Sequence, residues 1–317
     1  MACPLMGLPH RADPMSEAST PAPQSLTLYT PAGVLARVAP LRLAARRLKA
    51  MGYAVNVDEA ATARHQRFAG SDELRLQAIH RVARAAPDIA MATRGGYGLS
   101  RLLDAIDWPL LARSVDQGTR WVGYSDLTAL NLALLAHTQA PTWAGTLAVD
   151  DFGQETLDDV TVDCFNEAMS GELEAVGFRT AAGLDGLQAR GLLWGGNLTM
   201  VCALLGTRHW PKVKGGLLFL EDVNEHPYRV ERNLLHLLQA GVIDAQKAVI
   251  LGHFTAWKPV PLDRGYSLKS AVDALRARTR TPVLTGLPLG HVATHVTLPV
   301  GRRAQLLVQG RDALIGW

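Results

Sequence analysis

Apolar residues follow two alternating patterns along the first half of the chain. Short β-prone runs are each followed by a longer segment in which apolar positions recur at helical spacing. Strands are predicted at 26–30, 53–57, 88–92 and 121–124, and helices at 41–51, 72–86, up to 106, and 127–137. Because turn signals follow these strands, the pattern predicts a mostly parallel α/β sheet with its site beyond the carboxyl ends of the strands.

The second half resumes this pattern after a less regular stretch. One helix is predicted over Glu155–Met169, and the following Gly- and Ala-rich segment has the composition of an interdomain connection. Strands are then predicted at 191–194, 217–220, 248–252 and 283–284. Helices are predicted after the glycine turn as far as 205, at 228–239 and at 268–277. Residues 296–298 and 305–308 are predicted to form a closing hairpin.

Length sets the domain organisation, since 317 residues correspond to about two domains of roughly 150 residues. We expect a disordered leader over 1–25, which is rich in Pro, Ser and Ala, and an N-terminal α/β domain over 26–150. A connection over 151–190 then leads to a C-terminal domain over 191–317.

Composition excludes several classes of function. Hydrophobic residues make up 48% and charged residues 19%, as in an ordinary globular protein. The net charge of +3 and the absence of a basic run argue against nucleic-acid binding. No apolar run reaches the roughly 18 residues that a membrane span needs, and the N-terminus lacks a secretion signal, so we expect a cytoplasmic protein. The cysteines, at 3, 164 and 202, form neither a disulfide framework nor a zinc pattern.

Ser125 is the first residue with candidate chemistry. It lies in Gly123-Tyr124-Ser125-Asp126-Leu127, between a predicted strand and a predicted helix, where a hydroxyl points outward and free N–H groups can hold an oxyanion. The turn departs from the G-x-S-x-G pattern because Leu127 replaces the second glycine. The alternative is that Ser125 or Asp126 only caps the helix.

Glu221 and His291 could complete a catalytic set with Ser125. Glu221 ends a strongly apolar strand, and His291 lies in a Pro- and Gly-containing loop after another strand. Each also has an ordinary interpretation, as an exposed carboxylate at a strand end and as a loop histidine bonded to a carbonyl. Together they stand in the order Ser, Glu, His at strand ends, which suits a nucleophile, an orienting carboxylate and a base.

The Arg94-Gly95-Gly96-Tyr97-Gly98 turn offers weaker signals. It fits neither the dinucleotide fingerprint nor a P-loop, so its glycines either present N–H groups to an oxyanion or permit a tight turn. His291 and His295 are four residues apart but not on a helix, so we expect no metal site.

Six separate blocks make the chain resemble the muramoyltetrapeptide (LD-) carboxypeptidase family of serine peptidases, from Leu26 to Val308. The blocks are Thr30–Gly33, Arg94–Gly98, Gly123–Thr128, Gly195–Leu198, Leu220–Val223 with Glu225 and Pro227–Arg229, and Leu287–His291 with Leu298–Gly301. The resemblance implies an N-terminal flavodoxin-like domain and a C-terminal α/β domain with a swivelling β-barrel-like core. It further implies a homodimer and a reaction without metal or organic cofactor.

The same resemblance implies roles for single residues. Ser125 would be the nucleophile, His291 the base and Glu221 its orienting carboxylate, with Glu225 as the competing carboxylate. The oxyanion hole would be formed by the backbone N–H groups of Gly96 and Asp126.

The substrate implied by the resemblance is a cytoplasmic murein tetrapeptide that loses its terminal D-alanine during cell-wall recycling. Candidate substrate contacts are Arg94, for the free carboxylate, with Asn197 and Glu225. Two alternatives stay open, a self-immunity peptidase that cleaves peptide-nucleotide antibiotics and a non-catalytic small-molecule binding module.

Overall fold

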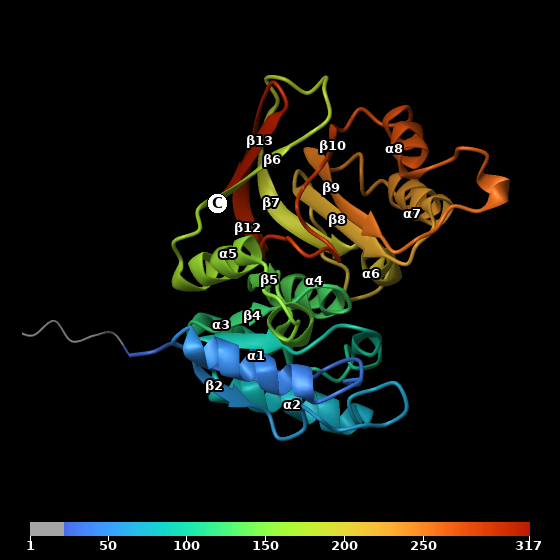
Figure 1. The fold of residues 1–317 in the computed structure, drawn as a ribbon. Coiled ribbons are helices and arrows are strands. Elements are labelled where there is room, and N and C mark those ends of the chain that lie inside the picture. Colours follow the sequence, from blue (N-terminus) through green and yellow to red (C-terminus); the bar gives the residue numbers. More distant parts are fainter. Residues whose placement is uncertain (1–21) are drawn as a thin grey trace, which may run out of the picture.

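A computed structural model describes residues 22–317 and divides them into two lobes (Figure 1). The N-terminal lobe is built on a six-stranded sheet of order β11-β5-β4-β3-β1-β2, parallel except for β11. Its strands are β1 (Ser25–Tyr29), β2 (Ala54–Val57), β3 (Ile89–Ala92), β4 (Arg120–Val122), β5 (Thr142–Ala144) and β11 (Leu298–Val300). The predicted leader lies almost wholly outside the described residues.

Helices cover both faces of this sheet, which explains why its strands are apolar on both sides. Leu26 and Leu28 of β1 pack toward α1 and α5, whereas Tyr29 of the same strand packs toward the core formed by α2, α3 and α4. The helices of this lobe are α1 (Ala39–Ala50), α2 (Asp72–Ala85), α3 (Trp108–Asp116) and α4 (Leu127–Thr138), with one 3₁₀ turn at Leu99–Arg101 and a π-helical turn at Ala148–Phe152.

The C-terminal lobe contains a seven-stranded sheet of order β10-β9-β8-β7-β12-β13-β6. The strands from β10 to β7 are parallel and the remaining three are antiparallel, so the sheet curls into a half-barrel. Its strands are β6 (Ala175–Arg179), β7 (Gln188–Asn197), β8 (Leu217–Val223), β9 (Ala248–Thr255), β10 (Val283–Thr285), β12 (Arg302–Gln309) and β13 (Asp312–Gly316). The helices of this lobe are α6 (Leu198–Leu204), α7 (Pro227–Gln239) and α8 (Leu268–Arg276), with a 3₁₀ turn at Pro261–Asp263, whereas α5 (Asp159–Ser170) packs on the N-terminal sheet.

The expected α/β class with two sheets is confirmed, but three local expectations are wrong. The helix expected to run up to residue 106 is only a 3₁₀ turn at Leu99–Arg101, and the helix of this segment, α3, begins later, at Trp108. Strand β6 lies inside the stretch expected to be irregular, and the residues at 296–298 do not pair with 305–308. Instead β11 joins the sheet of the other lobe, antiparallel to β5, where its proline can occupy an edge. Gly301, at φ 90°, then turns the chain back into β12.

Helix α4 joins the two lobes in one core. Its residues from Leu127 to Leu135 are all buried, which accounts for a sequence that is apolar on every side rather than on one face. It packs against α3 and β5 in its own lobe and against α6, β7 and β11 (Figure 1). In residues 22–317 no helix is long and apolar enough to cross a membrane.

Gly195→Ala is expected to destabilise the protein strongly. Gly195 has φ 139°, and a Cβ there would lie 1.9 Å from the carbonyl oxygen of Phe219 on β8, a backbone atom that cannot move aside. We expect the free energy of unfolding to fall by about 3 kcal/mol. Gly206→Ala is the matched control, because φ is 80° but nothing lies within 4 Å of its Cβ position. It should cost only about 1 kcal/mol, and equal losses in urea unfolding would contradict the clash.

Candidate active site

Ser125 lies on a strained turn between β4 and α4. Its φ is 63°, in the left-handed region that non-glycine residues seldom occupy. Gly95 makes the turn possible, because a Cβ on Gly95 would lie 2.8 Å from both Cβ and Oγ of Ser125. The serine is half-buried, at the carboxyl edge of the sheet where the sequence predicts it.

Buried Glu221 and partly exposed His291 form a carboxylate–imidazole pair in the C-terminal lobe. Glu221 is 1% exposed on β8, and its Oε2 lies 2.8 Å from Nδ1 of His291. A carboxylate only accepts hydrogen bonds, so Nδ1 of His291 is the donor in this pair, and Nε2 is the ring nitrogen not engaged by Glu221.

Two glycines make room for the Glu221 side chain. Cβ atoms built on Gly252 and Gly290 would lie 3.5 Å and 3.3 Å from Cβ of Glu221. A Cβ on Gly252 would also meet the carbonyl oxygen of Leu289 at 2.4 Å. The histidine loop therefore packs on β9 without side chains between the two backbones. Neither Gly252 nor this packing is predicted from the sequence.

The structure brings the serine turn and the histidine loop together from opposite lobes. The ring of Tyr124, next to Ser125, lies 4.9 Å from the ring of His291, centroid to centroid. Within residues 22–317, the described side-chain hydrogen bond of His291 is the one to Glu221, and Ser125 Oγ is not bonded to the imidazole. A base and its nucleophile often align only when substrate binds, so this arrangement suits a resting site.

The two predicted oxyanion donors come from two different turns, and Gly95, the residue before Gly96, packs on Ser125. Gly96 is exposed, with φ 94°, and packs against Gly33, whose N–H donates to the carbonyl of Gly95 at 3.1 Å. Asp126 follows Ser125, and its buried Oδ2 accepts the N–H of Leu99 at 2.9 Å. Burial raises the pKa of Asp126 to about 6 against that hydrogen bond. Both backbones are thus held in place.

The three predicted substrate contacts differ in how free their side chains are. Arg94 donates from Nη1 to the carbonyl of Val34 at 2.7 Å and lies beside Gly96. Asn197 is buried and caps α6, and its Nδ2 donates to Asp222 at 2.8 Å. Glu225 accepts a hydrogen bond from Arg229 at 2.6 Å and is about a quarter exposed. Arg94 thus keeps most of its donors.

A cavity of 610 Å³ opens beside the imidazole and contains two acidic residues that the sequence analysis does not single out. Tyr124, Asp150, Asp151 and His291 are among the residues that line it. Burial of the Asp150 carboxylate raises the pKa of Asp150, and the neighbouring charge of Asp151 raises it further. The cationic Arg94 acts in the opposite direction and lowers this pKa. The π-helical turn that carries both carboxylates leaves no simple periodic signal in the sequence.

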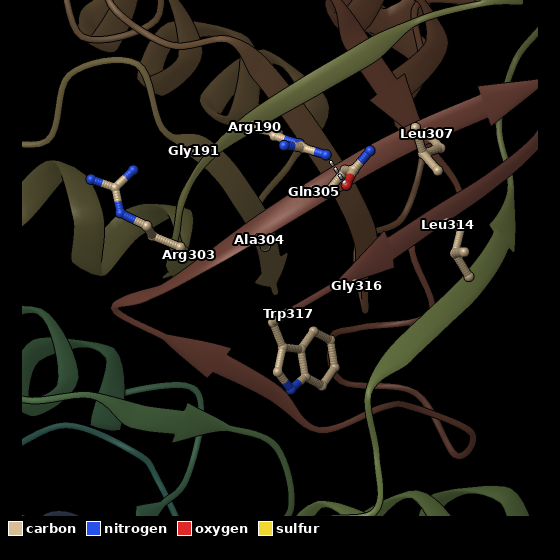
Figure 2. A pocket seen from close by; sticks show the side chains of 9 residues that line it. All are labelled: Arg190, Gly191, Arg303, Ala304, Gln305, Leu307, Leu314, Gly316 and Trp317. Atoms are coloured by element: carbon tan, nitrogen blue, oxygen red, sulfur yellow. Dashed lines mark hydrogen bonds between the residues drawn. The ribbon is translucent and has the colours of Figure 1, made fainter.

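A second hollow, of 580 Å³, lies on the outer face of the half-barrel (Figure 2). Its lining comes from β7, β12 and β13, and Arg190 there donates to Gln305 at 3.0 Å. None of the lining residues is a nucleophile or a general base. We therefore place the candidate site between the lobes.

A carboxylate–imidazole pair that lies next to a serine turn is typical of a serine hydrolase, and here the pair lies in a two-lobed α/β fold. Residues 27–145 match the model of the LD-carboxypeptidase N-terminal domain, and residues 190–306 match that of the LD-carboxypeptidase C-terminal domain. The chain therefore belongs to the LD-carboxypeptidase family and is a serine-type carboxypeptidase, which confirms the family resemblance seen in the sequence.

Individual relatives agree with this assignment. The murein tetrapeptide carboxypeptidase of Pseudomonas aeruginosa is 32% identical over 299 residues, covering 89% of this chain and 92% of the relative. A probable murein peptide carboxypeptidase of Bacillus subtilis is 28% identical over 302 residues, covering 92% and 93%. The crystal structure of muramoyltetrapeptide carboxypeptidase from Oxalobacter formigenes is 38% identical with a TM-score of 0.84, covering 92% and 97%. An MccF-like protein from Bacillus anthracis, 21% identical with a TM-score of 0.81 over 94% and 97%, shares the fold.

Glu221→Gln is expected to slow the reaction of Ser125 with a fluorophosphonate by roughly 10⁴-fold. A glutamine amide would donate to Nδ1 of His291 and move the ring proton to Nε2, where the base is needed. Mass spectrometry of the labelled protein measures the rate. Glu225→Gln is the control, since it removes the competing carboxylate four residues away. A larger loss in Glu225→Gln would overturn the assignment of Glu221.

Proposed function

We propose that this protein is a serine LD-carboxypeptidase that releases the terminal D-alanine from murein tetrapeptides. The observation that carries the proposal is the hydrogen bond between Glu221 and His291, held beside the Ser125 turn. The murein substrate is supported by relatives that carry this activity in their names and extend over most of the chain. We also propose a cytoplasmic role in cell-wall recycling and a homodimer, both on family resemblance.

In the first chemical step, His291 takes the hydroxyl proton of Ser125 on Nε2 as Oγ attacks the carbonyl carbon of the scissile amide. The buried Glu221 stays ionised and stabilises the imidazolium that forms. The negative charge on the carbonyl oxygen is held by the backbone N–H groups of Gly96 and Asp126. Each such donor contributes about 3 kcal/mol to the transition state where its deletion has been measured.

In the second half of the reaction, the imidazolium gives its proton to the departing amine, and D-alanine leaves with an ester left on Ser125. Water then gives a proton to Nε2 and attacks the ester carbonyl. Collapse of this second intermediate returns the proton to Oγ and frees the tripeptide. Every proton transfer in this mechanism uses Nε2 of His291. The mechanism therefore needs the tautomer in which Nδ1 donates to Glu221 and Nε2 carries the lone pair.

Ser125→Ala is expected to abolish release of D-alanine from free murein tetrapeptide, a loss of roughly 10⁶-fold as for other serine nucleophiles. Mass spectrometry of the reaction mixture, with wild type beside the variant, measures tripeptide and D-alanine. Release by both proteins would remove Ser125 from the mechanism. Release by neither would contradict the murein substrate, and cleavage of a peptidyl-nucleotide by the wild type would then favour the self-immunity alternative.

Arg94→Ala is expected to lower kcat/KM for the tetrapeptide by about 10- to 100-fold, because the free carboxylate of D-alanine loses its cation. The same peptide with an amidated C-terminus should be cleaved equally by variant and wild type. Arg101→Ala is the control, an exposed arginine of the same segment paired with Asp72. An unchanged kcat/KM for the tetrapeptide in Arg94→Ala would exclude this role.

A further inference from the structure

His295, four residues beyond His291, is a fully buried histidine whose Nδ1 is hydrogen-bonded, whereas its Nε2 has no hydrogen-bond partner within residues 22–317 and faces a carboxylate. Its side chain is 0% exposed. Nδ1 lies 3.0 Å from the carbonyl oxygen of Val292, and Nε2 lies 3.5 Å from Oδ1 of Asp151. The other oxygen of Asp151 accepts the N–H of Leu147 at 2.6 Å.

The acceptors dictate where the protons are. A carbonyl oxygen cannot donate, so Nδ1 of His295 carries a hydrogen, and a neutral ring would then point the lone pair of Nε2 at a carboxylate. Placing a second proton on Nε2 converts this repulsion into an ion pair, and removing either partner would leave the other charge buried and uncompensated.

From this geometry we propose that His295 is an imidazolium whose ion pair with Asp151 positions the catalytic His291 loop against the N-terminal lobe. Asp151 belongs to the π-helical turn, whereas His295 follows β10 of the other lobe. The inference deepens the proposed function, on which it rests for the role of His291. His295 itself would touch no reacting atom and is therefore a positioning residue.

Further hydrogen bonds tie the same loop to the start of α5. The N–H of His295 donates to Oγ1 of Thr161 at 2.9 Å, and this hydroxyl lies 3.1 Å from the carbonyl of Ala293. Thr294 donates to Asp158 at 2.5 Å. These hydrogen bonds fix the backbone of the histidine loop. The ion pair between His295 and Asp151 adds a charged contact with the π-helical turn, which also carries Asp150.

Tyr124 couples the two histidines. Its ring lies 5.3 Å from the ring of His295 and 4.9 Å from that of His291. A cation against an aromatic ring is favourable, so the imidazolium also holds Tyr124 in place between the two imidazoles. A displacement of His295 would therefore reach His291 through side-chain packing as well as through the loop.

The charges around His295 favour its protonated form. Burial lowers the pKa of His295, but the nearby carboxylate of Asp151, the Val292 carbonyl and the charge of Asp158 together raise it above its ordinary value. The other titratable groups near His295 are Asp150, on the same turn as Asp151, and the hydroxyl of Tyr124. His291 also contacts the ring of Tyr124. A raised pKa means that the ion pair stabilises the fold fully below about pH 6.5 and that this stability is lost only as pH rises through the folded value.

The charge itself can be measured without any substrate. In protein labelled with ¹⁵N-histidine, long-range ¹H–¹⁵N spectra at pH 6.5 should show His295 mostly protonated on both nitrogens, with His295→Gln providing the assignment. Asp151→Asn should return the ring to a neutral form with one unprotonated nitrogen. A neutral His295 in the wild type at this pH would overturn the proposal, whatever the enzyme's substrate.

The positioning role is tested by charge rescue. His295→Gln should slow fluorophosphonate labelling of Ser125 by about 10- to 100-fold, as a misplaced base would, and His295→Lys should recover most of the rate. His236→Gln, on the exposed face of α7, should label like the wild type. Equal losses in the Gln and Lys variants would reduce His295 to a packing residue. Absence of labelling in the wild type would count against the proposed function and leave the NMR result to decide the charge of His295.

Discussion

The hydrogen bond between Glu221 and His291 is the interaction on which the arrangement of the site depends. A carboxylate that is 1% exposed needs a donor, and the His291 ring supplies it at 2.8 Å. For the ring to reach it, the histidine loop must approach β9 at backbone distance, which Gly252 and Gly290 permit. Gly252 inside β9 and Gly290 in the histidine loop are thus the positions where burying one carboxylate beside one imidazole requires glycine.

The sequence predicts the parts of the site that depend on local chemistry. Ser125 is recognisable because a strand-to-helix turn has a short, specific composition, and the parallel strands follow from alternating apolar runs. The crossing of β11 into the other lobe leaves no such mark, since Leu298–Val300 are as suitable for a hairpin as for a sheet edge. Only the burial of these residues against β5 decides between the two, and burial is a tertiary property.

Side-chain availability is a second property that the pattern does not contain. Asn197 and Arg94 both lie in glycine-rich turns next to strand ends, yet Asn197 bonds to Asp222 and caps α6. Arg94 donates only one described hydrogen bond, to a backbone carbonyl. Asp150 and Asp151 show the converse, since they face the cavity from a π-helical turn that has no recognisable spacing. Motifs thus locate the segments of a site, and tertiary contacts determine which side chains are free.

The connections between the lobes also limit how the serine and histidine can meet. Helix α4 is buried by both lobes, β11 is hydrogen-bonded into the opposite sheet, and Arg208 bridges to Asp104 at 2.6 Å. A large rotation of one lobe would have to break this shared core, which costs far more free energy than substrate binding returns. In the proposed mechanism, the adjustment that brings Ser125 Oγ to Nε2 of His291 is therefore expected to be local, a change of side-chain rotamer and loop position within a rigid frame. In such a frame, the buried charge proposed for His295 would act directly on the geometry of the reaction.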